Sequence, residues 1–272
     1  MKLKKIIKSF IMFFKAKKYV PIIQVKEENK IFENKVALIS GGSGGIGLAI
    51  AKSLSDSGCK VFIGGTNEVK LKLIKEKYDY DYVVLNFNHL DSISYAINYI
   101  DSLCGKIDIF VNSSGVHTEN VNFFEVSADE YDRVMDINLK GTFFACQKIS
   151  NYMIEKRIKG SILLVSSNRG VEPAWSPYGL SKWAINGFTK GLAKMLCTYG
   201  INVNAISPGS TATELLGKKE GDEISTSENN YGRMITPEEV GTLAKLLVSD
   251  AGKMIDGEVV HISGGRGTFD IR

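Results

Sequence analysis

Short apolar segments alternate with amphipathic segments along most of the chain. Each apolar segment is about as long as a β-strand and is rich in β-branched or aromatic residues. These segments are residues 36–40, 60–64, 82–87, 107–112, 161–166, 201–207 and 258–263. The segments between them have helical periodicity and are residues 45–57, 67–77, 91–103, 127–157, 177–199 and 237–249. Because the apolar segments lack polar alternation, they predict strands that are buried on both faces. This order predicts one doubly wound α/β domain over 35–272, with about seven strands in a mostly parallel sheet and helices on both faces.

The first 34 residues differ from the rest in charge and in pattern. They contain nine lysines and three glutamates, a formal charge of +6, whereas the whole chain carries +4. The domain at 35–272 is therefore slightly acidic, and a nucleic-acid-binding domain is not indicated. In residues 3–14 the apolar side chains share one face of a helical projection and the lysines the other, except for Met12. This basic amphipathic extension is compatible with peripheral contact at an anionic membrane surface, a helix packed on the protein, an oligomer arm or a disordered tail.

Apolar run length and cysteine usage bear on the compartment. The longest apolar run of the extension, residues 10–14, is too short to span a bilayer or to form a signal-peptide core. The four cysteines form no C-x-x-C pair, and the three histidines show no metal-ligand spacing. We therefore expect a cytoplasmic protein with reduced cysteines and no metal site, with the inner membrane surface as its place of attachment if the extension binds lipid.

A glycine-rich loop joins the first predicted strand to the first predicted helix. Its sequence is SGGSGGIG, residues 40–47. Directly after a strand and at the start of a helix, glycines let backbone N–H groups approach a diphosphate, and the helix N-terminus adds its partial positive charge. The position of this loop, more than its composition, predicts a dinucleotide site.

This loop and several later motifs resemble, in order, those of the short-chain dehydrogenase/reductase family. The loop is similar to the family's T-G-x-x-x-G-I-G, with Ser40 in place of Thr. The sequence VNSSG at 111–115 is similar to the family's N-N-A-G with two serines as a departure, and YGLSK at 178–182 matches its Tyr-x-x-x-Lys. The resemblance covers 35–272 and excludes 1–34. It implies a Rossmann fold and an NAD(P)-dependent oxidoreductase that interconverts a ketone and a secondary alcohol by hydride transfer.

The resemblance also implies which residues bind the nicotinamide cofactor. They are Gly41, Ser43, Gly45, Ile46, Gly47, Thr66, Asn86, Phe87, Asn112, Gly115, Tyr178, Lys182, Pro208, Gly209 and Thr213. The second strand runs into Thr66 and Asn67 with no acidic residue at its tip, which removes the repulsion that a 2′-phosphate would meet. The arginine that commonly accepts this phosphate in the family is missing as well, although Lys70 follows closely and can supply charge. We favour NADP(H), with NAD(H) as the alternative.

The same resemblance implies a catalytic tetrad of Asn138, Ser167, Tyr178 and Lys182. Hydride transfer to a ketone leaves developing alkoxide charge, so a proton donor must sit on the carbonyl oxygen. A lysine ammonium one helical turn from a tyrosine favours the phenolate and lowers the tyrosine's pKa. In the family, Tyr is the acid/base, Ser polarises the carbonyl, Lys also holds the nicotinamide ribose, and Asn steadies a helix kink and a water of the proton relay.

The catalytic serine is assigned to Ser167 because the sequence from Ser167 to Gly170 matches the family's S-x-x-G; Ser166 is the fallback. The interval from Ser167 to Tyr178 is 11 residues, shorter than in many family members. A shortened loop between them would reshape the substrate pocket.

Residues that flank the predicted site are polar or aromatic, and they are His117, Asn168, Arg169, Glu172 and Trp175. The stretch at 215–234 lacks apolar periodicity and predicts a mobile loop that is rich in charge. These features suit a polar substrate such as a sugar, a polyol or a carrier-linked ketone. If the same side chains face solvent, they say nothing about the substrate.

Two other functions stay open. A 3-oxoacyl-carrier-protein reductase is the alternative within the family. A cofactor-binding scaffold or sensor at a membrane surface is the alternative of another class, and the presence of both Tyr178 and Lys182 argues against it. The resemblance further implies a homotetramer or homodimer, built in part through the long predicted helices at 127–157 and 177–199.

Overall fold

The computed structural model describes residues 30–119, 122–219 and 221–266. Seven strands form one sheet in the order β3-β2-β1-β4-β5-β6-β7, and every pairing is parallel. The strands are β1 Val36–Ser40, β2 Lys60–Gly65, β3 Asp81–Val84, β4 Ile109–Asn112, β5 Ser161–Val165, β6 Asn202–Pro208 and β7 Val259–Ile262. The predicted doubly wound α/β fold is confirmed. The amphipathic segment predicted at 3–14 lies outside the described residues.

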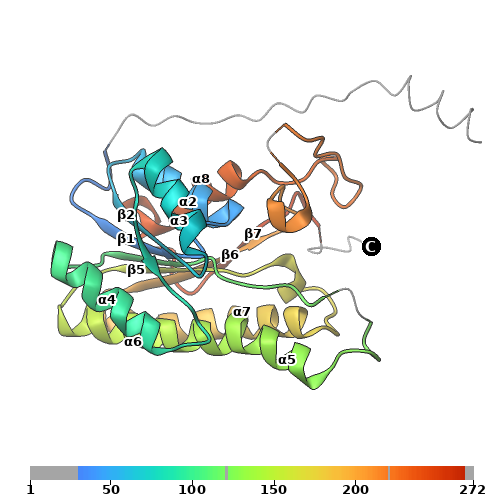
Figure 1. Cartoon of the computed structure of the whole chain (residues 1–272), viewed down its shortest axis with the longest axis horizontal. Coiled ribbons are helices and arrows are strands. Elements are labelled where there is room, and N and C mark those ends of the chain that lie inside the picture. Colours follow the sequence, from blue (N-terminus) through green and yellow to red (C-terminus); the bar gives the residue numbers. More distant parts are fainter. Residues whose placement is uncertain (1–29, 120–121, 220, 267–272) are drawn as a thin grey trace, which may run out of the picture.

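Helices cover both faces of the sheet (Figure 1). One layer consists of α2 Gly45–Ser55, α3 Glu68–Tyr78 and α8 Pro237–Val248. The other consists of α4 Asp91–Cys104, α5 Ala128–Met135, α6 Thr142–Glu155 and α7 Pro177–Leu196. Local sequence sets where these helices start: the Ser176 hydroxyl accepts the Gly179 N–H at the start of α7, and Thr236 forms a capping box with Glu239 at the start of α8.

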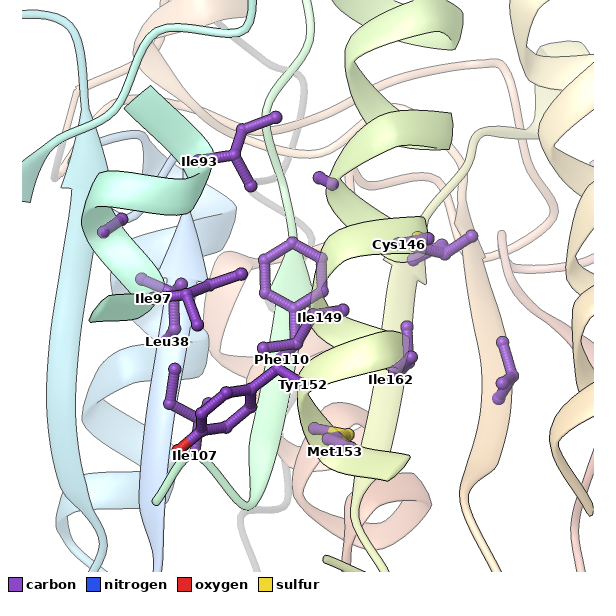
Figure 2. Close-up of a cluster of buried hydrophobic side chains, with 14 of the residues drawn as sticks. Leu38, Ile93, Ile97, Ile107, Phe110, Cys146, Ile149, Tyr152, Met153 and Ile162 are labelled. Atoms are coloured by element: carbon purple, nitrogen blue, oxygen red, sulfur yellow. The ribbon is translucent and has the colours of Figure 1, made fainter. Parts of the chain in front are cut away.

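A hydrophobic core lies on each side of the sheet, because the strands carry apolar side chains on both faces. In the core under α4 and α6, Phe110 of β4 is central and only 2% exposed. Ile97 of α4 and Ile149 of α6 lie around its ring (Figure 2). These contacts hold the helices that follow β3 and β4 against the sheet, and so fix the loops at its carboxyl edge.

The helix predicted over 127–157 is confirmed as one helical run over 128–155, but its helix type changes in the middle. A π-helical turn, Asp136–Gly141, separates α5 from α6. In this turn the Thr142 hydroxyl donates to the Asn138 carbonyl oxygen at 2.6 Å. Gly141 packs so closely on Phe87 that a Cβ there would collide with the ring. The wide turn therefore depends on tertiary contacts that periodicity does not reveal, and such turns often occur at functional sites.

Two ends of the predicted elements also differ. Phe32, before the predicted domain start, is buried in the core under α2, and its N–H donates to the Ser57 carbonyl oxygen at 3.0 Å. The strand predicted to reach Phe87 ends at Val84, where the chain leaves the sheet. Among the described residues, no helix is long and apolar enough to cross a bilayer. All four cysteines are free, as predicted.

We expect Phe110→Ala to lower the free energy of unfolding by about 3–5 kcal/mol, because the buried ring would leave a cavity that its neighbours fill only in part. Phe124 is 92% exposed and provides the control. Phe124→Ala should change the same quantity by less than about 0.5 kcal/mol. Urea denaturation followed by circular dichroism measures both variants, and equal effects would contradict this description of the core.

Candidate active site

The carboxyl ends of the central strands open onto one large cavity. Because β1 lies between β2 and β4, the connections after β1 and β4 leave on opposite faces of the sheet, and a crevice forms where they part. The cavity has a volume of about 950 Å³. Its lining reaches from the glycine loop after β1 to Tyr178 on α7 and Pro208 at the end of β6. The strand order thus fixes where a ligand can bind.

The loop after β1 fits a dinucleotide diphosphate. Gly41 has a φ of +67°, and a Cβ on it would lie 2.6 Å from the Ser113 carbonyl oxygen. A Cβ on Gly45 would lie 2.7 Å from the Thr213 methyl group. Glycine at these positions therefore lets the loop pack against the segments after β4 and β6, with its backbone along the cavity at the start of α2, where the helix N-terminus favours negative charge. The residues present fit a nicotinamide dinucleotide.

A buried hydrogen-bonded chain supports the cavity floor. The Ser40 hydroxyl donates to the Asn112 side-chain oxygen at 2.7 Å, and the Asn112 amide donates to the Thr142 hydroxyl at 2.7 Å. The same Asn112 oxygen accepts the Ser114 N–H at 3.1 Å. The serines that depart from the family motifs therefore leave the turn after β4 closed. Asn112 itself lies under the floor, where it links β1 to α6.

Asn138 ties the π-helical turn to the loop after β4. Its side-chain oxygen accepts the Val116 N–H at 2.8 Å, and its amide donates to the Val116 carbonyl oxygen at 2.9 Å. The amide also donates to the Ser181 hydroxyl on α7 at 3.2 Å. Asn138 is fully buried. It therefore positions three segments of the site from behind the cavity wall.

Tyr178, Ser167 and Lys182 meet at the wall that α7 forms. The hydroxyls of Tyr178 and Ser167 are hydrogen-bonded to each other. Lys182, one turn further along α7, places its Nζ 5.5 Å from the centre of the Tyr178 ring. Its side chain is 4% exposed and donates to the Val165 carbonyl oxygen at 2.9 Å. The structure thus brings three predicted tetrad residues together and places Asn138 behind them.

The two serines after β5 have different partners. Ser166 is buried, and its hydroxyl donates to the Asn186 side-chain oxygen at 2.5 Å. The Ser167 hydroxyl accepts the Arg169 N–H at 3.2 Å and reaches Tyr178. This geometry favours Ser167 over the fallback Ser166 as the partner of the tyrosine.

The electrostatics of the tyrosine–lysine pair differ from expectation. Burial raises the pKa of Tyr178, and the hydrogen bond with Ser167 and the charge of Arg169 offset only part of this effect. Burial also lowers the pKa of Lys182 to about 8. The expectation of a lowered tyrosine pKa is therefore wrong for this structure, because burial outweighs the groups that favour the phenolate. The raised pKa favours the protonated phenol of Tyr178.

Charged side chains from three loops close the substrate end of the cavity. Arg266, after β7, donates to Glu172 at 2.9 Å and is also ion-paired with Glu228 in the loop after β6. Arg169 pairs with the same Glu172 at 2.9 Å. The sequence singled out Arg169 and Glu172. It gave no signal for Glu228 and Arg266, because their contacts join residues far apart in the chain.

An ion pair spans the opposite end of the cavity. Lys70 Nζ, in the first turn of α3, lies 2.6 Å from a carboxylate oxygen of Glu214, which lies in the loop after β6. Lys70 holds the pKa of the Glu214 carboxyl below its ordinary value. Thr66 lines the same region. The charge that the sequence offered for a 2′-phosphate is therefore already paired.

Most predicted site residues line the cavity. They are Gly41, Ser43, Gly45, Ile46, Thr66, Asn86, Phe87, Gly115, Ser167, Tyr178, Lys182, Pro208, Gly209 and Thr213. Gly47, Asn112 and Asn138 lie behind this lining; a Cβ on Gly47 would collide with the Gly41 carbonyl oxygen, so this glycine allows α2 to pack on the loop. Thr118 was missed, although its hydroxyl accepts the Tyr178 N–H at 3.1 Å. No cluster of His, Cys, Asp and Glu side chains in the described part of the chain has the grouping of a metal site.

Fold and site together define a nicotinamide-dependent oxidoreductase. A family model described as short chain dehydrogenase matches residues 35–224. The 3-oxoacyl-(acyl-carrier-protein) reductase of Rickettsia typhi is 35% identical over 241 residues, which cover 86% of this chain and 97% of that protein. A short chain dehydrogenase structure from Bacillus anthracis matches with a TM-score of 0.81 and 30% identity, covering 89% of this chain and 100% of that one.

A 3-ketoacyl-(acyl-carrier-protein) reductase from Brucella melitensis, solved in complex with NADH, matches with a TM-score of 0.79 and 26% identity over 87% of this chain and 100% of that one. The chain belongs to the short-chain dehydrogenase/reductase family. It is an NAD(P)-dependent oxidoreductase that acts on CH–OH and C=O groups.

The burial of Lys182 predicts a cost in stability. The pKa of Lys182 is about 8 in the folded protein and higher in the unfolded chain. The unfolded chain therefore binds the proton more tightly, and the free energy of unfolding rises with pH between these two pKa values. We expect Lys182→Met to raise the unfolding free energy of the cofactor-free protein at pH 7 by about 1–3 kcal/mol, and the gain to shrink as the pH is raised towards 10. Urea denaturation at pH 7 and 9.5 tests this. Lys194→Met, at an exposed lysine of the same helix, is the control. A gain in Lys182→Met that does not depend on pH would contradict the explanation.

Proposed function

We propose that the protein reduces a polar ketone to a secondary alcohol with NADP(H), and that Tyr178 donates the proton. The observation that carries the proposal is the hydrogen-bonded pair of Tyr178 and Ser167, with buried Lys182 beside the ring, in the cavity that also contains the glycine loop. The nicotinamide cofactor supplies the hydride when it is bound.

The side chains divide the remaining work. The carbonyl oxygen of the substrate accepts hydrogen bonds from Ser167 and Tyr178, so that Ser167 polarises the C=O bond. Tyr178 transfers its proton as negative charge develops on that oxygen. The Lys182 ammonium, 5.5 Å from the ring centre, offsets the charge that remains on the phenolate. Asn138 keeps the loop after β4 and helix α7 in place during this transfer.

The residues around the tyrosine favour a polar substrate. Arg169, Glu228 and Arg266 line the cavity and offer donors and acceptors, and half-exposed Trp175 offers a flat apolar face. A sugar or polyol ketone matches both features. A carrier-linked 3-oxoacyl group is the second candidate, because relatives at 35% identity carry that activity in their names. Turnover of a panel of both substrate classes distinguishes them.

NADP(H) is the proposed cofactor because the tip of β2 presents Thr66 and Asn67 and no carboxylate. A 2′-phosphate at this end meets the Lys70–Glu214 pair and competes with Glu214 for the lysine. The preference for NADP(H) over NAD(H) therefore depends on how much more strongly Lys70 binds the 2′-phosphate than it binds Glu214.

A homo-oligomer built through the helices at the lower layer in Figure 1 is part of the proposal, since Phe143 of α6 and Trp183 of α7 are exposed apolar side chains. Peripheral membrane contact through residues 3–14 stays a hypothesis from the sequence. A scaffold without chemistry is disfavoured by the arrangement of Tyr178 and Lys182, which such a protein has no need to keep.

We expect Tyr178→Phe to abolish ketone-dependent oxidation of NADPH, because the ring stays and the proton donor is lost. The Kd for NADPH, measured by fluorescence titration, should stay within about twofold of the unaltered protein, a difference of about 0.4 kcal/mol in binding free energy. Retained turnover in Tyr178→Phe would refute the assignment of the proton donor. Loss of both turnover and cofactor binding would indicate a structural defect instead.

Lys70→Met should weaken NADPH binding about tenfold, the equivalent of one charge-assisted contact, and leave NADH binding nearly unchanged. Glu214→Gln should tighten NADPH binding, because it releases Lys70. Glu68→Gln, which removes the Glu68–Lys72 pair on the same helix outside the cavity, is the control. Titration of all variants with both cofactors tests the proposal, and tighter NADH than NADPH binding by the unaltered protein would reject it.

A further inference from the structure

The imidazole of His117 covers one face of the Tyr178 ring. The two ring centres are 4.1 Å apart and the planes are inclined by 16°. This is a stacked contact between two aromatic side chains. Both residues line the cavity, and Lys182 Nζ lies near the same tyrosine ring. The phenol of Tyr178, the proposed proton donor, is thus held between the His117 imidazole and helix α7.

The loop that presents His117 is anchored on both sides of that residue. Val116 makes two backbone hydrogen bonds with the Asn138 side chain, at 2.8 and 2.9 Å. The carbonyl oxygen of His117 accepts from Arg133 of α5 at 2.8 Å. The hydroxyl of Thr118 accepts the Tyr178 N–H at 3.1 Å. The position of the imidazole is therefore set by α5, by the π-helical turn and by the first turn of α7.

We propose that His117 is a positioning residue for proton transfer: its imidazole packs on the Tyr178 ring and holds the phenol at the angle at which its hydroxyl meets Ser167. This inference rests on the proposed role of Tyr178. A ring held on one face by a stacked neighbour has less freedom to turn away from the substrate oxygen, and the reaction rate depends strongly on such orientation.

The surroundings of His117 make this contact depend on pH. Burial, Lys182 of α7 and Arg169 after β5 all lower the pKa of His117, so the imidazole is neutral at pH 7. On the α5 side, the charged groups nearest its loop are Arg133 and its partner Glu130. The His117 side chain is exposed to the cavity, and protonation would add a positive charge beside Lys182 and Arg169. Repulsion by these two cations is therefore expected to move the imidazolium away from the tyrosine ring into solvent, and kcat to fall as the pH drops through the lowered pKa of His117.

Three variants test the inference by kinetics. His117→Ala removes the stack and should lower kcat about tenfold, with NADPH binding changed by less than about twofold. His117→Phe keeps a ring in place, so it should retain most of the kcat at pH 7 and should lose the decline at acid pH. His89→Ala, at an exposed histidine outside the cavity, should behave like the unaltered protein. An unchanged kcat in His117→Ala, or the same acid decline in His117→Phe, would overturn the inference.

A second measurement does not depend on turnover. The ultraviolet absorbance of phenolate is titrated in each protein and in the same protein carrying Tyr178→Phe, and the difference isolates one of the 11 tyrosines. His117→Ala should move the Tyr178 titration to lower pH, because the ring gains water, whereas His117→Phe should leave it in place. An unmoved titration in His117→Ala overturns the inference. If the titration moves and the unaltered protein turns over no ketone, the proposed function fails while the contact of His117 with Tyr178 stands.

Discussion

The geometry of the active site depends on the buried side chain of Asn138. Hydrogen bonds of its side-chain amide join the π-helical turn, the loop after β4 and helix α7. The backbone carbonyl oxygen of the same residue accepts a hydrogen bond from the Thr142 hydroxyl. Through Thr142 and Asn112 the network continues to Ser40 on β1. Because a buried polar group without a partner is costly, this fully bonded network allows one arrangement of the three segments. The network thereby positions Tyr178, which lies on α7, and His117, which lies in the loop after β4.

Function and stability are opposed at Lys182. The ammonium is buried against a neutral carbonyl oxygen, that of Val165, and its depressed pKa measures how poorly the site solvates it. The same position is where positive charge is needed once the tyrosine has given up its proton. The ammonium is thus poorly solvated before the reaction and is paired with a phenolate during it. Such an arrangement is a common form of the conflict between stability and activity.

The sequence predicted the fold well because each strand has both faces buried and each helix has a separate periodic pattern. The residues of the predicted tetrad and the glycine loop lie at or behind the wall of one cavity, and they could be singled out because their spacing is local or lies within a family motif. Helical periodicity did not reveal the π-helical turn inside the helix over 128–155, because that turn depends on tertiary contacts such as the packing of Gly141 on Phe87. The sequence also missed groups such as Arg266 and Thr118, whose partners lie far away in the chain. The raised pKa of Tyr178 depends on burial that only the packed structure defines.

The strand order has a consequence for the chain as it is synthesised. β1 pairs with β2 on one edge and with β4 on the other, so Ser40 faces both Gly64 and Asn112. While the ribosome has released only β1, β2 and β3, one edge of β1, a strand that is buried along its whole length, has no neighbour. An unpaired apolar edge is a template for association with other chains. Fragments that end before β4 are therefore expected to aggregate, and a soluble truncation of this domain has to retain at least the strands on both sides of β1.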